Sequence, residues 1–264
     1  MTTVPPNGTY EGYAVPPSVY EVGFDWDASP EVDKLMLLAR SHGVQPKSAL
    51  ELGCGVGRLV RALRQRVGYV CGIDLSSDMV NQGLACEGDI DLKVGDMSDF
   101  NLARRFDLIH TSANTVRHVT TDAAIAGMWQ CIAAHLEPGG LFIADLELGF
   151  KAEGVKLNRP STWTISRKGT TVCVGWRVVG LPGKGDRCCT VQLVFEARGN
   201  ICGTWSERFP LRTYDAPEFV RMAREEGGLD LCGLFEVRDP YLFERSPEQA
   251  EGRFLVVLRR TIGD

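Results

Sequence analysis

Three glycines follow a short apolar segment near residue 50, and the turn they form could hold a phosphate or a nucleoside. The segment reads Glu51-Leu52-Gly53-Cys54-Gly55-Val56-Gly57-Arg58. Without Cβ atoms the backbone can approach a ligand closely, and the helix that follows presents free N–H groups. The dinucleotide fingerprint Gly-x-Gly-x-x-Gly fails, because Arg58 stands where the third glycine belongs. Glu51 suits the ammonium group of an amino acid better than a pyrophosphate, although a plain tight turn is the alternative.

Two further carboxylates follow neighbouring strand-like segments and suit a nucleoside. Asp74 ends the segment 69–73, where a carboxylate can accept hydrogen bonds from both hydroxyls of a ribose. Asp96 and Met97 follow the segment 90–94, and they suit the amino group and the ring face of an adenine. The alternatives are local: Asp74 as part of the N-cap region of the next helix, and Asp96 as a turn residue.

A polar stretch from His110 to Val119 follows the next strand-like segment and offers candidates for the reaction. Ligands of open α/β sheets bind at the carboxyl ends of the strands. His118 could act as a base or orient an acceptor, with a structural histidine as the alternative. His110 lies inside the strand and is expected in the core. For Arg117, contact with an anionic substrate and simple solvation both stay open.

An alternation of strand-like and helix-like segments positions these residues. The helix over 121–136 is the clearest, because five apolar side chains share one face: Ile125, Met128, Trp129, Ile132 and Leu136. The apolar segments typical of strands are 48–52, 69–73, 90–94, 106–111, 141–146, 229–237 and 254–259. Repeated strand–helix–strand units predict an α/β fold with a mostly parallel sheet covered by helices on both faces.

The pattern changes between residues 150 and 209. Four segments rich in Thr, Val, Trp and Cys are separated by glycine-containing turns, which predicts an antiparallel β insertion. We expect it to cover an acceptor pocket, to pair subunits in a homodimer, or to do both. Trp163, Trp176 and Trp205 could line that pocket, with packing as their alternative role. The predicted division is an N-terminal arm at 1–28, irregular over 1–27, a core domain at 29–149 and 210–264, and the insertion at 150–209.

Composition excludes several classes of function. The chain has 264 residues and a net charge of −5, which argues against a nucleic-acid partner because phosphate contacts need a basic surface. We find no signal peptide and no apolar run of about 18 residues, so no membrane partner is expected and the location predicted is cytoplasmic. Nine cysteines without a Cys-x-x-Cys pair predict reduced thiols and no metal site.

Taken together and in this order, the motifs resemble those of class I (Rossmann-like) S-adenosylmethionine-dependent methyltransferases. The resemblance covers about 45–150 and 212–260 and implies a seven-stranded sheet whose last strand is antiparallel. It implies S-adenosyl-L-methionine as cofactor. The cofactor contacts that it implies are Gly53, Cys54, Gly55, Asp74, Leu75, Asp96 and Met97, to which Glu51 is added for the ammonium group.

A second resemblance narrows the subset. Residues 110–119 are similar to the Asn-Ser-x-x-His-Leu stretch of sugar-amine and glycine N-methyltransferases, with Asn114 and His118 at the matching positions. Tyr20 resembles a tyrosine of the N-terminal arm that could close over the methionine moiety, with arm packing as the alternative. Met79 is expected against the adenosine or in the core.

The sequence thus predicts methyl transfer from S-adenosylmethionine to a nitrogen or oxygen of a small polar metabolite, with nitrogen slightly favoured. In-line displacement from a sulfonium needs alignment and exclusion of water, and a base only where the acceptor loses a proton. His118 is the candidate catalytic residue. The alternatives are a catalytically silent protein that binds the cofactor for a partner, and an NAD(P)-dependent oxidoreductase.

Overall fold

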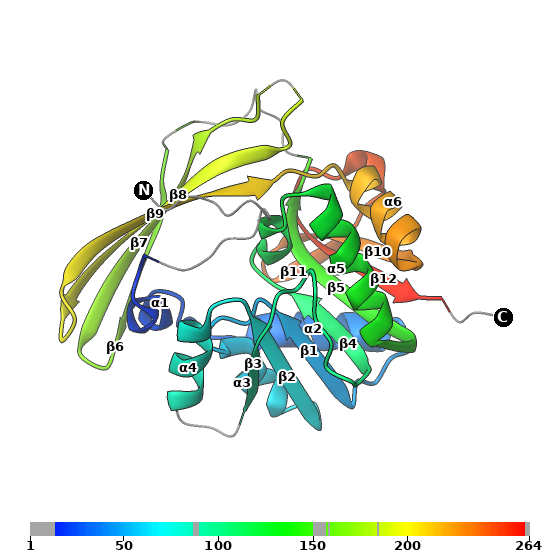
Figure 1. Ribbon diagram of the computed structural model, residues 1–264, viewed down its shortest axis with the longest axis horizontal. Coiled ribbons are helices and arrows are strands. Elements are labelled where there is room, and N and C mark those ends of the chain that lie inside the picture. Colours follow the sequence, from blue (N-terminus) through cyan, green and yellow to red (C-terminus); the bar gives the residue numbers. More distant parts are fainter. Residues whose placement is uncertain (1–13, 87–89, 150–156, 158, 184, 262–264) are drawn as a thin grey trace.

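Two β-sheets of unequal size organise the chain in the computed structural model (Figure 1). The structure describes residues 14–86, 90–149, 157, 159–183 and 185–261. Residues 1–13 of the predicted arm, and 150–156 and 158 at the start of the predicted insertion, lie outside this part of the chain. The larger sheet has eight strands and the smaller sheet has four.

The larger sheet has the order β11-β10-β12-β5-β4-β1-β2-β3. Its strands are β1 (Ser48–Leu52), β2 (Tyr69–Asp74), β3 (Asp91–Val94), β4 (Phe106–Thr111), β5 (Leu136–Leu148), β10 (Leu229–Arg238), β11 (Tyr241–Glu244) and β12 (Gly252–Arg260). The five strands from β3 to β5 pair in parallel, and β12 is antiparallel to both β5 and β10. The carboxyl ends of the parallel strands therefore meet at one edge, where the predicted motifs begin.

Helices cover both faces of this sheet, as the alternation of segments predicts. The helices are α2 (Ser29–Ser41), α3 (Arg58–Arg64), α4 (Ser77–Ala85), α5 (Asp122–His135) and α6 (Ala216–Gly227). Helices α2, α3 and α4 pack on one face, and α5 and α6 pack on the other. Local chemistry sets three of their starts, because Ser76, Thr121 and Asp215 each accept a hydrogen bond from a backbone N–H three residues on.

The smaller sheet is an antiparallel meander with the order β6-β7-β8-β9. Its strands are β6 (Ser161–Arg167), β7 (Thr170–Gly180), β8 (Cys188–Gly199) and β9 (Gly203–Arg212). Helix α1 (Pro17–Gly23) packs on this sheet, and Val19 and Val22 share a buried apolar cluster with Val174 and Phe195. Figure 1 shows the sheet standing beside the larger one, with α1 next to it.

Three expectations need correction. The arm is not irregular throughout, because Pro17–Gly23 is helical where it meets the smaller sheet. The larger sheet has eight strands rather than seven, since the chain turns at Asp239-Pro240 and β11 pairs antiparallel with β10. Strand β5 is longer than the predicted segment 141–146, since it runs over Leu136–Leu148 with an irregularity near Gly139, whose φ is 78°.

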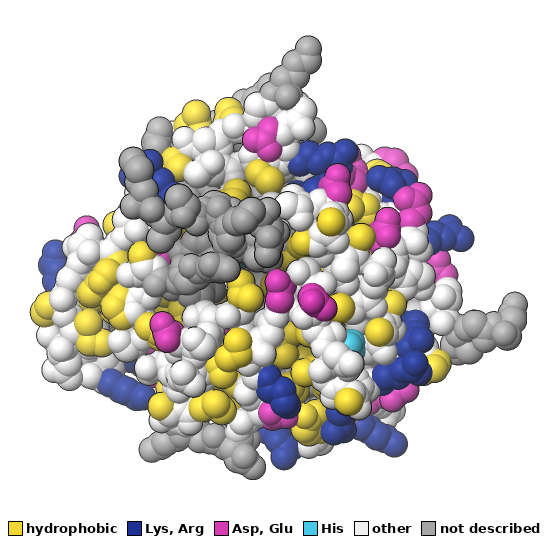
Figure 2. Space-filling view, in the orientation of Figure 1, with side chains coloured by type: hydrophobic (Ala, Val, Ile, Leu, Met, Phe, Trp, Pro, Cys, Tyr) yellow, Lys and Arg dark blue, Asp and Glu magenta, His cyan; other side chains and the backbone are white. Residues whose placement is uncertain are grey.

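The surface carries charges of both signs. On the face in Figure 2, acidic and basic side chains alternate over the region of α6. Within the described ranges, no helix is long and apolar enough to cross a bilayer, and His, Cys, Asp and Glu side chains form no group of three that could bind a metal ion.

Trp129 is central to the packing between α5, α6 and the sheet. It is 1% exposed, and its ring meets Phe142 and Phe219 edge to face at centroid distances of 5.7 and 5.1 Å. We predict that Trp129→Ala lowers the free energy of unfolding by about 3–5 kcal/mol in urea denaturation, because a large buried ring leaves a cavity. Leu37→Ala, at a residue 55% exposed, is the control and should change it by less than about 0.5 kcal/mol. Equal losses would contradict this prediction.

Candidate active site

A cavity of about 1120 Å³ lies between the carboxyl edge of the larger sheet, helix α1 and the smaller sheet. Every residue that the sequence singled out for the cofactor or for catalysis lines it. These residues are Tyr20, Glu51, Gly53, Cys54, Gly55, Asp74, Leu75, Met79, Asp96, Met97, Asn114 and His118. The cavity thus brings together segments that are far apart in the sequence, although their individual roles stay predictions.

The glycine turn forms one wall of the cavity. Gly53, Gly55 and Gly57 have φ values of 69°, 54° and 78°, which side chains other than glycine rarely adopt. Position 53 also has no room for a side chain, because a β-carbon there would overlap the side chain of Thr115. The backbone N–H groups of Gly53 and Cys54 both donate to the Ile73 carbonyl, which holds the turn against β2.

Asp74 stands at the end of β2 and faces this turn. Its Oδ2 accepts a 2.7 Å hydrogen bond from the Gly55 N–H, and its Oδ1 accepts from the Ser76 N–H at 2.9 Å. The side chain is 5% exposed, and this burial raises the pKa of Asp74 despite the two donors. Asp74 therefore fixes the turn in place while its oxygens keep lone pairs for a ligand hydroxyl.

Four residues were predicted to surround the adenosine, and their surroundings in the cavity differ. Met97 approaches Gly53, and Leu75 is 39% exposed where it lines the cavity. Met79 is 2% exposed and fully part of the packing, so its alternative role in the core is realised as well. Asp96 lines the cavity, but its Oδ1 already accepts hydrogen bonds from the N–H and the hydroxyl of Ser98, as expected of a turn residue.

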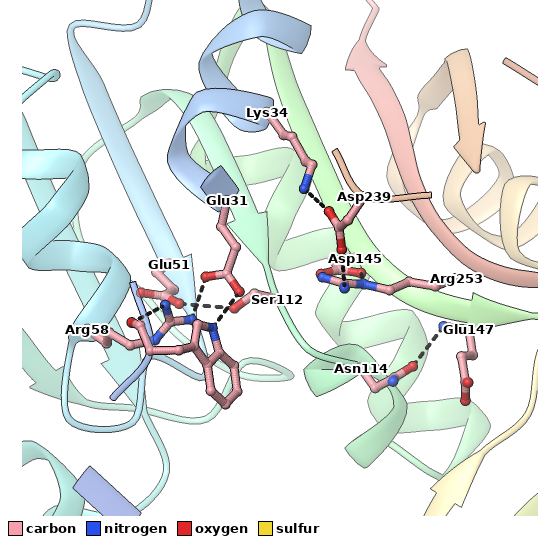
Figure 3. Close-up of polar contacts among 11 residues, drawn as sticks. Glu31, Lys34, Glu51, Arg58, Ser112, Asn114, Asp145, Glu147, Asp239 and Arg253 are labelled. Carbon is pink, nitrogen blue, oxygen red and sulfur yellow. Dashed lines mark hydrogen bonds and ion pairs between the residues drawn. The ribbon is translucent and has the colours of Figure 1, made fainter. Parts of the chain in front are cut away.

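Glu51 carries the strongest signal for a bound cation. The residue is 3% exposed at the end of β1; its Oε1 accepts a 3.3 Å hydrogen bond from Ser112, and its Oε2 is buried without a partner (Figure 3). Burial raises the pKa of Glu51 to about 8, although the nearby Arg58 opposes the rise. A buried carboxylate oxygen without a partner is costly, so an ammonium group at this place would stabilise it.

Arg58 is a lining residue that the sequence reasoning did not assign. Its guanidinium forms a 2.5 Å ion pair with Glu31 and lies 4.8 Å from the centroid of the Trp26 ring. Figure 3 shows Arg58 beside Glu51, so opposite charges are neighbours in this corner. The position of Arg58 directly after the glycine turn is visible in the sequence, but its partners lie 27 and 32 residues away.

Tyr20 lies on α1 and connects the arm with the smaller sheet. Its hydroxyl donates a 2.9 Å hydrogen bond to Glu207 of β9, and its ring stacks on Phe24 at a centroid distance of 5.3 Å. Glu207 also accepts from the backbone N–H of Val15 at 2.9 Å. The arm packing that was the alternative for Tyr20 is therefore present, and the same residue lines the cavity.

Asn114 and His118 flank and end a short 3₁₀ helix, η1 (Thr115–His118), that follows β4. Asn114 precedes it in a left-handed conformation with φ 68°, and its Oδ1 accepts a 2.7 Å hydrogen bond from the Glu147 N–H of β5. The His118 ring lies 4.9 Å from that of Phe209 of β9. Burial, helped by the charge of Arg117, lowers the pKa of His118 to about 4, so this imidazole is neutral at pH 7.

Other sequence expectations meet mixed outcomes. His110 is in the core as predicted, fully buried, with its pKa lowered to about 3 by that burial. Trp163 and Trp176 line the cavity, whereas Trp205 does not, since it packs over Gly203 in its own strand. Arg117 is neither solvated nor in the cavity, because the residue is 1% exposed and each nitrogen of its guanidinium donates a hydrogen bond.

The donor that the resemblance implies fits these residues. The partnerless oxygen of Glu51 suits the ammonium group of its methionine part, and Asp74 suits its ribose. The glycine turn keeps the backbone open between them. On geometry alone the cavity can therefore accept an adenosyl amino acid, and its remaining walls come from the smaller sheet.

Comparisons with known proteins also point to methyltransferases. Residues 49–140 match a family described as a methyltransferase domain. A dTDP-3-amino-3,6-dideoxy-alpha-D-glucopyranose N,N-dimethyltransferase of Streptomyces fradiae is 31% identical over 146 residues, which are 55% of this chain and 56% of that protein. The chain thus spans about half the length of the curated relatives that it matches.

Solved structures extend the likeness over nearly the whole chain. DesVI of Streptomyces venezuelae has a TM-score of 0.73 and 23% identity, covering 94% of this chain and 99% of its own. CalS10 of Micromonospora echinaspora, an amino pentose methyltransferase with S-adenosylmethionine bound, has a TM-score of 0.70 and 19% identity, covering 96% and 99%. The chain therefore has the fold of the class I, Rossmann-like S-adenosylmethionine-dependent methyltransferases and resembles the sugar-amine N-methyltransferases, as its motifs predicted.

Proposed function

We propose that this protein transfers a methyl group from S-adenosyl-L-methionine to an amino nitrogen of a small polar metabolite. The observation that carries the proposal is the single cavity that joins the glycine turn, Asp74 and Glu51 to His118 and the smaller sheet. The names of the relatives favour nitrogen over oxygen, since both the Streptomyces fradiae and the Micromonospora echinaspora proteins are described as methyltransferases of amino sugars.

Each part of the chain has its own task in this proposal. The glycine turn and Asp74 bind the adenosine and ribose, while Glu51 holds the ammonium group. The bound donor supplies an electrophilic methyl group on a sulfonium with a good leaving group. Helix α1 and strands β6–β9 exclude water from the cavity, and Trp163 and Trp176 contribute walls of the acceptor side. We propose this cap role for the inserted sheet; pairing of subunits through it stays open.

His118 acts on the acceptor. An imidazole whose pKa lies near 4 is neutral at pH 7 and can accept a hydrogen bond from an acceptor N–H. That bond directs the lone pair of the uncharged amine, which is the nucleophilic form, toward the methyl group. Such a weak base orients the acceptor more than it stores its proton, because efficient proton transfer needs a pKa near the working pH. The proton leaves to solvent as the product departs.

The first experiment offers the protein a methyl donor with a deuterated methyl group. Pooled amines, including nucleotide-bound and free amino sugars and amino acids, serve as acceptors, and mass spectrometry reads the labelled product. We expect label on an amine nitrogen and an increase in melting temperature with S-adenosylhomocysteine but not with NADH, because only a bound ligand stabilises the fold. Label on oxygen would overturn the nitrogen assignment, and stabilisation by NADH alone would overturn the whole proposal.

Asp74→Asn tests the ribose site. We expect the Kd for S-adenosylhomocysteine to rise roughly 5- to 150-fold in calorimetry, which corresponds to about 1–3 kcal/mol for hydroxyls that lose their acceptor. Asp78→Asn is the matched control, because Asp78 is an exposed carboxylate in the first turn of α4 and lies outside the cavity. An unchanged Kd in Asp74→Asn would contradict the assignment.

Glu51 predicts a pH dependence of cofactor binding. Because the Glu51 pKa is about 8, this carboxyl is mostly protonated below pH 8 in the free protein. An ammonium group favours the carboxylate, so binding releases about one proton, and affinity rises up to roughly tenfold per pH unit between about pH 6 and 7.5. Calorimetry in buffers of different ionisation enthalpy measures the proton. Glu51→Gln should remove the pH dependence; a slope that persists there would refute this role.

His118→Asn tests the acceptor side. If His118 is the group that directs the acceptor, turnover should fall by roughly 10²-fold, as expected when a reacting group is misplaced, while the Kd for S-adenosylhomocysteine changes less than about twofold. His42→Gln serves as the control, since His42 lies at the end of α2 and outside the cavity. A loss of turnover below about fivefold with intact cofactor binding would make His118 structural.

A further inference from the structure

Arg117 is a buried cation at the junction of the two sheets. Its Nε donates a 2.7 Å hydrogen bond to the carbonyl of Arg212, the last residue of β9, and its Nη2 donates to the Cys189 sulfur of β8 at 3.6 Å. Its Nη1 contacts Asn114 Oδ1 and Glu147 Oε2, each at 3.2 Å. The guanidinium therefore connects η1 with the ends of β5, β8 and β9 at once.

These contacts act on the segment that carries His118. Thr115, at the start of η1, lies against Gly53 of the glycine turn, and Arg117 ties the same short helix to the smaller sheet. His118 follows directly, with its ring against Phe209 of β9. A four-residue 3₁₀ helix has little rigidity of its own, so contacts outside it must fix the direction of the imidazole.

We propose that Arg117 is a positioning residue for methyl transfer, which holds the His118 imidazole at a fixed place between the glycine turn and the smaller sheet. This inference rests on the proposed function of the cavity. Arg117 itself touches neither donor nor acceptor, because it lies outside the cavity. A burial this complete is expensive for a charge, and here it is compensated by hydrogen bonds that Arg117 donates to acceptors on β5, β8 and β9.

The other charged groups on the elements packed against η1, and those across the cavity, have partners of their own. On β5, Glu147 pairs with Arg117 and Asp145 accepts two hydrogen bonds from Arg253. On β9, Arg212 points to Asp122 and Glu218, and Glu207 accepts from Tyr20. Across the cavity, Glu51 accepts from Ser112. Arg117 is the charge that acts on the titration of His118, after burial itself.

The test compares two buried arginines at the same junction. In Arg117→Met and Arg117→Lys we expect kcat to fall at least about tenfold, because the His118 imidazole is no longer held in a fixed position. The Kd for S-adenosylhomocysteine should change less than about threefold, because Arg117 does not contact the cofactor site. In the ligand-free protein, NMR should show the His118 pKa higher by about half a unit or more in Arg117→Met, since a neighbouring cation is gone. His118→Asn identifies the resonance.

Arg212→Lys is the matched control, since Arg212 is 2% exposed and its guanidinium contacts Asp122, Glu218 and the Thr120 carbonyl, all of which follow His118 in the chain. We expect it to lower the melting temperature as much as Arg117→Lys does, but to leave the His118 pKa unchanged. If Arg117→Met does not fold, Arg117→Lys carries the kcat comparison. An unchanged His118 pKa, or equal losses of kcat in both lysine variants, would overturn the positioning role. Failure of the wild-type protein to bind the donor would instead overturn the proposed function.

Discussion

The close approach of Thr115 to Gly53 is the constraint on which the cavity depends. A β-carbon at Gly53 would overlap the threonine side chain, so the turn after β1 and the helix η1 after β4 can touch only because residue 53 is glycine. This contact brings the two neighbouring strand ends to one wall. Asp74 then fixes the turn from β2, and Arg117 fixes η1 from the smaller sheet. The site is thus a consequence of close backbone packing before any ligand is present.

Much of the fold follows from local sequence. The helices α4, α5 and α6 begin at side chains that cap the next turn, and β1 and β4 are apolar runs with the bounds that the sequence predicts. Helix α1 and strand β11 were missed because they are short and depend on distant partners. The apolar side of α1 is buried against the smaller sheet, and β11 needs β10 to pair with.

The site divides in the same way. The glycines and carboxylates at strand ends can be predicted from the sequence, because their types and spacing are set by the backbone and by the ligand. The roles of Arg58 and Arg117 cannot be predicted in this way, since a charged residue in a sequence is ordinarily expected to be solvated. Arg117 can be buried because its Nε–H donates a hydrogen bond to the Arg212 carbonyl, 95 residues away in the sequence. The partner of a buried charge is a property of the tertiary fold.

The position of the four-stranded meander in the chain has a consequence for how such proteins diversify. It lies between β5 and α6 in the chain, and the strands that form the glycine turn and hold Asp74 come earlier in the sequence. The residues just before and just after it are neighbours, because the Gly149 N–H donates a hydrogen bond to the Tyr214 carbonyl. The meander can therefore be exchanged or remodelled in evolution without a change in the segments that carry the glycine turn and Asp74. Grafting the meander of a relative, together with its own equivalent of the Arg117 tether, is the corresponding route for protein engineering.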